Sequence, residues 1–162
     1  MDDFINLKKI QDKLALNNWS LYEYQKEFLK YQSQKKFRQI LISSEIGTGK
    51  TITAFLPFFK NEINKTKKKV IYISPLKSIN TTLKERLTEL SSNLGIKCKI
   101  EKRTSDISYI TKKKQLFNVP DILLTTPESL TLMIANANAT SLLENTDYFI
   151  VDELNEFIAS KR

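Results

Sequence analysis

The stretch from Arg38 to Thr51, RQILISSEIGTGKT, is an apolar run that leads into a glycine-rich turn. The turn ends in GKT, and the residues from Ile52 onward have helical spacing. A buried strand, a glycine-rich turn and a helix, in this order, are typical of a loop that binds phosphate groups. Gly47 and Gly49 allow the backbone to turn and to bring its N–H groups against phosphate oxygens. We therefore predict that the chain binds a nucleoside triphosphate.

The side chains of this loop suit the same ligand. Lys50 can reach the β- and γ-phosphates, and the hydroxyl of Thr51 can ligate Mg²⁺. The helix that starts near Lys50 directs its positive end at the same anion. The alternative, an ordinary turn before a helix, is disfavoured by the strand predicted in front of the loop. The nucleotide-binding residues predicted here are Ile46, Gly47, Thr48, Gly49, Lys50, Thr51 and Ile52.

Length and composition favour one soluble globular domain, predicted for residues 1–162. No apolar run approaches membrane-spanning length and the first ten residues do not resemble a signal peptide, so we expect no membrane partner. Cys98 is the single cysteine and histidine is absent, which excludes disulfides, cysteine metal sites and histidine chemistry. We predict a reducing, cytoplasmic compartment.

The charge balance favours a polyanionic partner. There are 26 Lys and Arg against 18 Asp and Glu, which gives a net charge of +8. Nucleic acid is the partner that such a balance suits best. A biased composition rich in Lys, Ile and Asn is the alternative. The clusters Lys65–Lys69 and Lys112–Lys114 are interpreted as solvated edges of helices.

Apolar runs and amphipathic stretches alternate along the chain. The N-terminal section, about residues 1–36, has helical spacing. Strands are expected at 40–42, 70–73, 96–100, 122–124 and 148–151, with helices at 52–64, 78–93, 107–117 and 128–143. This alternation predicts an α/β fold: a mostly parallel sheet with helices on both faces, in three layers. In such sheets ligands bind at the carboxyl ends of the strands.

The residues after two of these strands suit an anion. After residue 73, Pro75 turns the chain off the strand, the next helix offers free N–H groups, and Lys77 adds charge. A plain helix cap with a solvated lysine is the alternative. After residue 124, Thr126 is a natural N-cap and Pro127 a natural first helical residue, so capping alone explains that segment equally well. The same device at two strand ends favours a phosphate-binding track.

The last predicted strand is followed by two acids, Asp152 and Glu153. A triphosphate-binding loop needs such a pair: Asp152 to hold Mg²⁺ through water and Glu153 to orient and deprotonate the attacking water. An acidic helix cap is the alternative. Upstream, Gln25 can hydrogen-bond an adenine edge, although an ordinary polar residue on an amphipathic helix is the commoner reading. Trp19 is expected in the core.

These segments, in this order, resemble the first RecA-like domain of a superfamily 2 helicase, of the DEAD/DEAH type and closest to the large helicase-related group. SSEIGTGKT resembles motif I, YISPLKS motif Ia, TTPESL motif Ib and VDELN motif II. Gln25 falls where the family has its adenine-reading glutamine. The segment Arg103–Asp106 resembles a short motif that faces nucleic acid. The resemblance extends from about residue 19 to residue 162.

The resemblance implies a role for each motif. Lys50 and Glu153 would be catalytic, Thr51 and Asp152 would hold the metal, and ATP with Mg²⁺ would be the cofactors. One strand of DNA or RNA would be held through its phosphates by Pro75, Lys77, Arg103, Thr126 and Ser129. Three positions depart from the family: Asn155 ends motif II, Ser105 replaces a glycine, and Tyr24 stands where a proline usually precedes the glutamine.

The chain ends nine residues after Glu153, before motif III. A helicase closes ATP between two RecA-like domains, and the resemblance implies a second domain, or a second chain, that carries motifs III to VI with an arginine finger. We therefore expect an incomplete ATP-dependent helicase with little activity of its own. Two other classes stay open: a motor that translocates on duplex without unwinding it, and a nucleic-acid-binding module with a vestigial nucleotide site.

Overall fold

The computed structural model describes residues 2–15, 19–33, 39–45, 47–63, 65–136 and 139–159. The chain divides into two compact units: Met1–Lys67 with Ser91–Ile96, and Lys68–Leu90 with Lys97–Arg162. The single-domain organisation expected from the sequence stays a prediction. Among the described residues, no helix combines the length and the apolar character that a membrane crossing requires.

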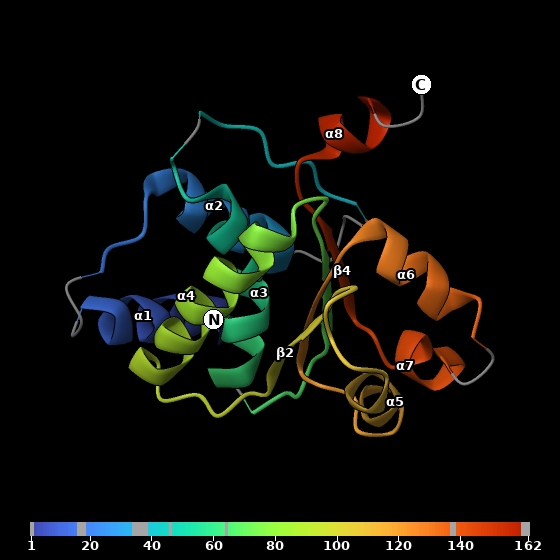
Figure 1. Ribbon diagram of the computed structural model, residues 1–162. Coiled ribbons are helices and arrows are strands. Elements are labelled where there is room, and N and C mark those ends of the chain that lie inside the picture. The colour runs from blue at the N-terminus through green and yellow to red at the C-terminus, as the bar shows by residue number, and fades with distance from the viewer. Residues whose placement is uncertain are drawn as a thin grey trace. The chain divides into compact units, whose positions relative to one another are not determined.

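The first unit is helical. It contains α1 (Asp2–Ala15), α2 (Glu23–Ser33) and α3 (Lys50–Ile63), which contact one another in pairs (Figure 1). The apolar spacing that predicted the N-terminal helices is reflected in their burial: Ile10 and Leu14 of α1 and Leu29 of α2 are buried. The section expected to be helical contains α1 and α2, while its bounds as a section of the domain stay a prediction.

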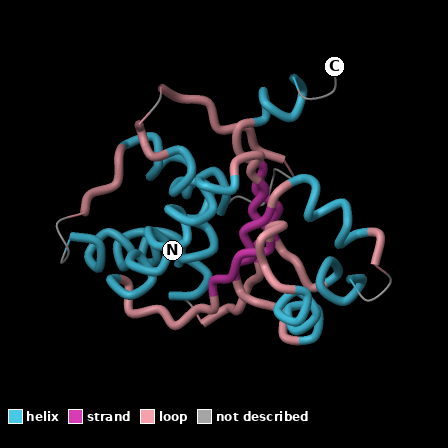
Figure 2. Tube along the Cα trace, viewed as in Figure 1, coloured by secondary structure: helices cyan, strands magenta, loops and turns pink. Residues whose placement is uncertain are grey.

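The second unit contains a four-stranded sheet, in which every strand is parallel to its neighbours. Figure 2 draws these strands in magenta. The strands are β1 (Val70–Ile73), β2 (Ile100–Arg103), β3 (Ile122–Thr125) and β4 (Tyr148–Val151), in the order β2-β3-β1-β4. β1 and β3 are buried along their whole length, as central strands of a parallel sheet are. The predicted α/β fold with a parallel sheet is confirmed.

Helices cover this sheet on both faces. They are α4 (Lys77–Asn93), α5 (Tyr109–Phe117), α6 (Pro127–Ile134), α7 (Thr140–Glu144) and α8 (Leu154–Ala159). Ile71, Ile73 and Leu123 form one apolar cluster with Leu116 of α5, Met133 of α6 and Leu142 of α7. In Figure 1, α4 lies on the opposite side of the strands from α5, α6 and α7.

Three expected elements differ from the structure. Residues 40–42 are not a strand: Leu41 is 81% exposed and Ile40 45% exposed. Three apolar residues form a strand only where a neighbour supplies ladder hydrogen bonds, and this segment has no strand pairing among the described residues. β2 begins at Ile100 rather than ending there, because pairing with β3 starts at that residue. The helix expected at 128–143 is two helices, α6 and α7, since α6 stops before the asparagine at 136.

Candidate functional site

The carboxyl ends of the four strands meet along one edge of the sheet. In the pairing register, Ile73 of β1 lies beside Thr125 of β3 and Val151 of β4, and Arg103 of β2 lies beside Thr125. Ile73 and Val151 directly precede segments that the sequence singled out, and Thr125 and Arg103 begin two others. The register therefore brings the segments after the strands to one edge of the sheet.

Asp152, the first residue after β4, is fixed by its main chain and by its side chain. Its N–H donates to the carbonyl of Ile73 at 3.0 Å. The carboxylate accepts the hydroxyl of Tyr72 at Oδ2, 2.7 Å away, and the N–H of Glu153 at Oδ1, 3.0 Å away. A partly buried carboxylate is thus held at the end of an apolar strand, where the sequence predicted the metal-holding acid.

Glu153 is exposed and has a backbone φ of 53°, in the left-handed region. Non-glycine residues seldom adopt this conformation, and it occurs disproportionately at functional sites. The carbonyl of Glu153 accepts the N–H of Glu156 at 2.9 Å, which opens helix α8. The chain therefore turns sharply between β4 and α8, and this turn carries both acids.

The segment after β1 contacts the turn after β2. Lys77 is the first residue of α4 and is exposed, and its Nζ donates to the hydroxyl of Ser105. Lys112 of α5 donates to the carbonyl of Ser105 at 3.4 Å. A hydrogen bond from Thr104 and the backbone N–H of Asp106 hold the pKa of the Asp106 carboxyl below its usual value. Two lysines and a carboxylate therefore surround the turn in which Ser105 replaces the expected glycine.

The segment after β3 caps a helix, as one of the two open interpretations proposed. Thr126 is the N-cap of α6, its side chain accepts the N–H of Ser129 at 3.4 Å, and Pro127 begins the helix. Thr126 and Ser129 are 2% and 8% exposed. Pro75, after β1, is partly exposed. The contacts of Pro75, Thr126 and Ser129 with nucleic acid stay a prediction.

Arg103 makes structural contacts. Its side chain is 7% exposed, and its Nη1 donates to the carbonyl of Lys112 at 2.6 Å and to Oε1 of Gln115 at 3.2 Å. The guanidinium therefore joins the end of β2 to helix α5. The contact of Arg103 with nucleic acid that the resemblance implies stays a prediction.

In the first unit, the glycine-rich turn adopts the backbone that its sequence predicted. Gly47 and Gly49 each have a φ of 83°. A Cβ at Gly49 would also lie 3.3 Å from Nε2 of Gln25, so both the positive φ and the space beside Gln25 favour glycine at this position. Lys50 begins α3, and its Nζ donates to the carbonyls of Ser44 at 2.5 Å and Glu45 at 2.8 Å. Thr48, Thr51 and Ile52 are partly buried, and Ile46 lies outside the described residues.

Gln25 is turned toward this loop rather than outward. It is 5% exposed; its Nε2 donates to the hydroxyl of Thr53 at 2.9 Å, and its Oε1 accepts the N–H of Tyr22 at 3.0 Å. In the structure the amide of Gln25 braces the loop through Thr53, and its predicted role as the adenine-reading residue stays a prediction. Trp19, expected in the core, is 44% exposed.

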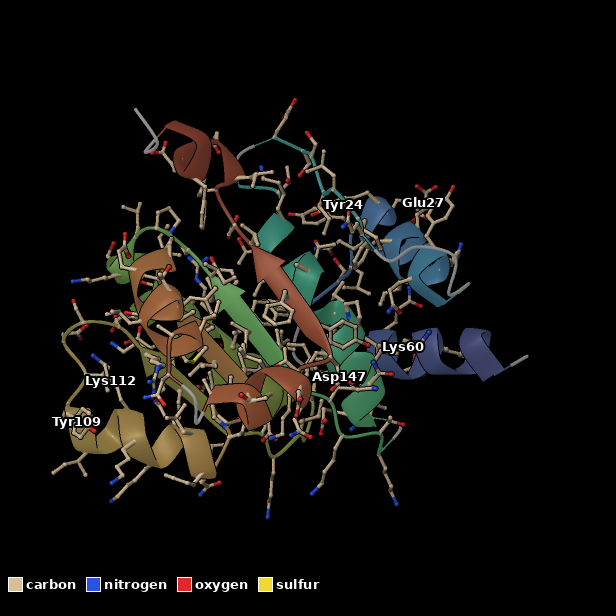
Figure 3. All side chains as sticks on the ribbon, turned by 90° about the vertical axis from the view of Figure 1, so that its right-hand side faces the viewer. Tyr24, Glu27, Lys60, Tyr109, Lys112 and Asp147 are labelled. Carbon is tan, nitrogen blue, oxygen red and sulfur yellow. The ribbon has the colours of Figure 1, made fainter. Side chains whose placement is uncertain are left out.

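Three residues of these sites were not predicted from the sequence. Tyr24, seen only as a departure from the family, comes from α2 (Figure 3) and donates to the carbonyl of Thr48 at 2.6 Å. Thr53 is fully buried, and its hydroxyl donates to the carbonyl of Gly49 at 2.9 Å. Tyr72 holds Asp152. The one available signal for Tyr72 was a polar tip inside the apolar run VIYI.

The acid pair suits Mg²⁺ as the predicted metal. Among the described residues, no three His, Cys, Asp or Glu side chains gather to hold a metal by themselves. Mg²⁺ does not need such a cage, because it commonly binds one or two protein oxygens together with substrate phosphates and water. Asp152, directly after β4, is an oxygen ligand of that kind, and the Thr51 hydroxyl in the first unit stays a predicted ligand.

Comparison with known proteins identifies relatives over most of the chain. Residues 22–162 match the DEAD/DEAH box helicase family. The chain is 37% identical over 142 residues to the ATP-dependent helicase Lhr-Core of Sulfolobus acidocaldarius, which covers 79% of this chain and 16% of that protein. It is 32% identical over 149 residues to the Lhr helicase/uracil glycosylase of Escherichia coli, with coverages of 75% and 9%.

Two solved structures share the fold. The Mycobacterium smegmatis helicase Lhr bound to ssDNA and AMP-PNP matches with a TM-score of 0.80 and 24% identity, over 91% of this chain and 20% of that one. The DUF1998 helicase MrfA bound to DNA and AMPPNP matches with a TM-score of 0.77 and 24% identity, over 92% and 21%. The chain thus spans less than a quarter of the length of any of these four proteins.

Proposed function

Because this chain belongs to the DEAD/DEAH box helicase family, we propose that it is the ATP- and nucleic-acid-binding half of an ATP-dependent superfamily 2 helicase. The observation that carries the proposal is the pairing of two features: a glycine-rich turn with positive φ at Gly47 and Gly49, and an acid pair directly after strand β4. Either feature alone has a structural explanation. A nucleoside triphosphatase needs both.

For ATP, we assign each loop residue the role that its chemistry allows. Backbone N–H groups of residues 46–51 surround the phosphates, and the Lys50 ammonium neutralises the β- and γ-phosphates. Thr51 and Asp152 supply oxygens toward Mg²⁺, which offsets charge on the phosphates when bound. Glu153 orients the attacking water and accepts its proton. Gln25, which precedes the loop in the sequence, and Ile52, which follows it, support the loop.

For nucleic acid, we propose a single strand held through its phosphates. The start of α4 with Lys77 and the start of α6 with Thr126 and Pro127 offer N–H groups, hydroxyls and one exposed ammonium. Ser105, in contact with Lys77, extends this track to the turn after β2. The proposal is supported by the net charge of +8 and by the Mycobacterium smegmatis relative, whose structure contains ssDNA.

The proposed partner within the enzyme is a second RecA-like domain with motifs III to VI, on the same or another chain. The relatives are several times longer than this chain, which leaves room for such a domain. That domain would supply the arginine that stabilises charge on the γ-phosphate during transfer. The cofactors are ATP and Mg²⁺, and the expected compartment is the cytoplasm.

The proposed function is tested by titrating a fluorescent ATP analogue into the 162-residue chain, with Mg²⁺ and with EDTA. Wild type should bind with Mg²⁺, and Lys50→Ala should lose at least tenfold in affinity, because a charge-assisted hydrogen bond to phosphate contributes about 1.5–3 kcal/mol. Lys67→Ala, at an exposed lysine of the same unit, is the control and should bind like wild type. Equal affinities for wild type and Lys50→Ala would contradict the phosphate-loop assignment.

A further inference from the structure

Strand β1 carries a buried tyrosine whose hydroxyl meets an acid of motif II. Tyr72 is 0% exposed and lies among the apolar residues Val70, Ile71 and Ile73. Its hydroxyl donates to Oδ2 of Asp152 at 2.7 Å. A buried tyrosine usually needs a partner for its hydroxyl, and here that partner is the carboxylate proposed to hold the metal.

The sheet register explains why these two side chains meet. Tyr72 is paired with Ile150 of β4, and Asp152 follows two residues later. Residues two apart on an extended chain point to the same face, so Tyr72, Ile150 and Asp152 share a face at the carboxyl edge. The N–H of Asp152 also donates to the carbonyl of Ile73 at 3.0 Å, which ties its main chain to β1.

The Asp152 carboxylate accepts a hydrogen bond at each of its two oxygens, and the phenol of Tyr72 supplies the one at Oδ2. The second carboxylate oxygen, Oδ1, accepts the N–H of Glu153 at 3.0 Å. Two donors that approach different oxygens fix the plane of the carboxylate as well as its position.

We propose that Tyr72 is a positioning residue for the magnesium site: its hydroxyl holds the Asp152 carboxylate in the one orientation that presents it to Mg²⁺. The inference rests on the proposed function and assigns a role to the first residue of the segment that resembles motif Ia. Partners that orient a metal ligand usually matter for metal affinity by a factor of about 10–100. Without the hydroxyl, Asp152 would still carry its charge but would sample other rotamers.

The test is a Mg²⁺ titration of nucleotide binding with Tyr72→Phe, which removes one oxygen and keeps the ring. We expect the Mg²⁺ concentration at half-saturation to rise by about tenfold. Affinity for the nucleotide in EDTA should match wild type, because Tyr72 acts only through Asp152. The matched control is Tyr109→Phe, at a tyrosine that is 78% exposed at the start of α5 (Figure 3), and it should titrate like wild type.

The outcomes separate the inference from the function. If Lys50→Ala loses binding while Tyr72→Phe titrates at the wild-type Mg²⁺ concentration, the positioning role is wrong and the ATP site stands. If the nucleotide affinity of wild type is the same with Mg²⁺ and with EDTA, and Lys50→Ala binds the nucleotide as tightly as wild type, the proposed function fails and the inference fails with it.

A second measurement needs no nucleotide. Urea unfolding is compared for Tyr72→Phe alone and in an Asp152→Ala background, as a double-mutant cycle. The loss of stability from Tyr72→Phe should be clearly larger when Asp152 is present. Equal losses in the two backgrounds would show that the hydroxyl and the carboxylate do not interact in solution, and would overturn the inference whatever the titration gives.

Discussion

The Nε2 of Gln25 lies 2.9 Å from the hydroxyl of Thr53, and this hydrogen bond ties helix α2 to the first turns of α3. The same hydroxyl donates to the carbonyl of Gly49 at 2.9 Å and lies 3.0 Å from the hydroxyl of Tyr24. Tyr24 in turn donates to the carbonyl of Thr48. Two side chains of α2 therefore support two carbonyls of the glycine-rich loop: Tyr24 binds that of Thr48 directly, and Gln25 supports that of Gly49 through the buried Thr53.

The first prediction concerns this threonine. Thr53→Val keeps the shape of the side chain but leaves the buried Nε2 of Gln25 without its acceptor. An unsatisfied buried donor costs about 1–3 kcal/mol, so the free energy of unfolding should fall by that amount in a urea titration. Affinity for the ATP analogue should also fall, because the carbonyl of Gly49 loses the hydroxyl that binds it and Gln25 loses its contact with the loop.

The control is Thr131→Val in α6. Thr131 makes the same type of bond to the carbonyl four residues back, at 2.9 Å, but it is exposed. Water can hydrogen-bond to the carbonyl that loses the hydroxyl, so the free energy of unfolding should change by no more than about 0.5 kcal/mol. Similar losses at the two positions would show that the buried network has no special part in stability.

The second prediction concerns base selectivity. If Gln25 braces the loop, Gln25→Ala should weaken ATP and GTP analogues by the same factor, since the triphosphate is common to both. A glutamine that reads adenine would instead lose affinity for ATP alone. Competition binding of the two nucleotides measures this, with Gln32→Ala on the same helix as the control. A loss confined to ATP would restore the role that the sequence suggested.

Gln25 shows where the sequence was sufficient and where it was not. Its position upstream of the loop followed from the motif order. The direction of its amide depends on Thr53, and no sequence pattern predicted that Thr53 is buried. The strands β1, β3 and β4 were predicted because each is a continuous apolar run, which a parallel sheet requires. Helices α3, α4 and α5 were predicted from amphipathic spacing in the same way.

The predictions that failed depend on long-range pairing. Residues 40–42 are as apolar as β1, yet only a neighbouring strand turns such a run into a strand. β2 contains Glu101 and Lys102, so it is not an apolar run, and the apolar residues before it predicted a strand that starts four residues too early. The start of β2 is set by its register with β3. The burial of Arg103 likewise depends on a partner in another element, the carbonyl of Lys112 on α5, which the sequence does not reveal.

The third prediction concerns nucleic-acid binding. Affinity for a single-stranded oligonucleotide should fall steeply with salt and show little sequence preference, because phosphate contacts release counterions. Lys77→Ala should reduce the slope of log affinity against log salt by roughly 0.7, the value for one phosphate contact on a single strand. Fluorescence anisotropy at several salt concentrations measures the slope.

The comparison variant for this measurement removes the charges of Lys112, Lys113 and Lys114 on α5. These lysines should influence binding less than Lys77 does, since the sequence places them on a solvated helix edge. A wild-type slope for Lys77→Ala, together with loss of binding in the α5 variant, would locate the phosphate track on α5 instead.

The fourth prediction concerns the strained backbone of Glu153. A left-handed residue with a Cβ costs about 1–2 kcal/mol, and asparagine adopts this conformation more readily than glutamate. Glu153→Asn should therefore raise the free energy of unfolding by up to about 1 kcal/mol while it removes any hydrolysis. Glu156→Asn, inside α8, should lower stability slightly because asparagine is a poorer helix former. If Glu153→Asn is less stable than wild type, the inference that the backbone at Glu153 is strained is wrong.

The last prediction concerns the partner domain. The isolated chain should turn over ATP barely above background, because Glu153 can place a water while the charge that develops on the γ-phosphate has no arginine to stabilise it. Phe149 and Val151 of β4, which are 53% and 46% exposed, should also make the chain prone to association.

Adding a RecA-like domain with motifs III to VI in trans, together with nucleic acid, should raise turnover by roughly 10³-fold or more, as arginine fingers do in related NTPases. Glu153→Gln should abolish this gain and leave ATP bound, which separates chemistry from binding. Rapid hydrolysis by the 162-residue chain alone, in a phosphate-release assay with Lys50→Ala as the blank, would show that it is a self-sufficient NTPase and that the two-domain proposal is wrong.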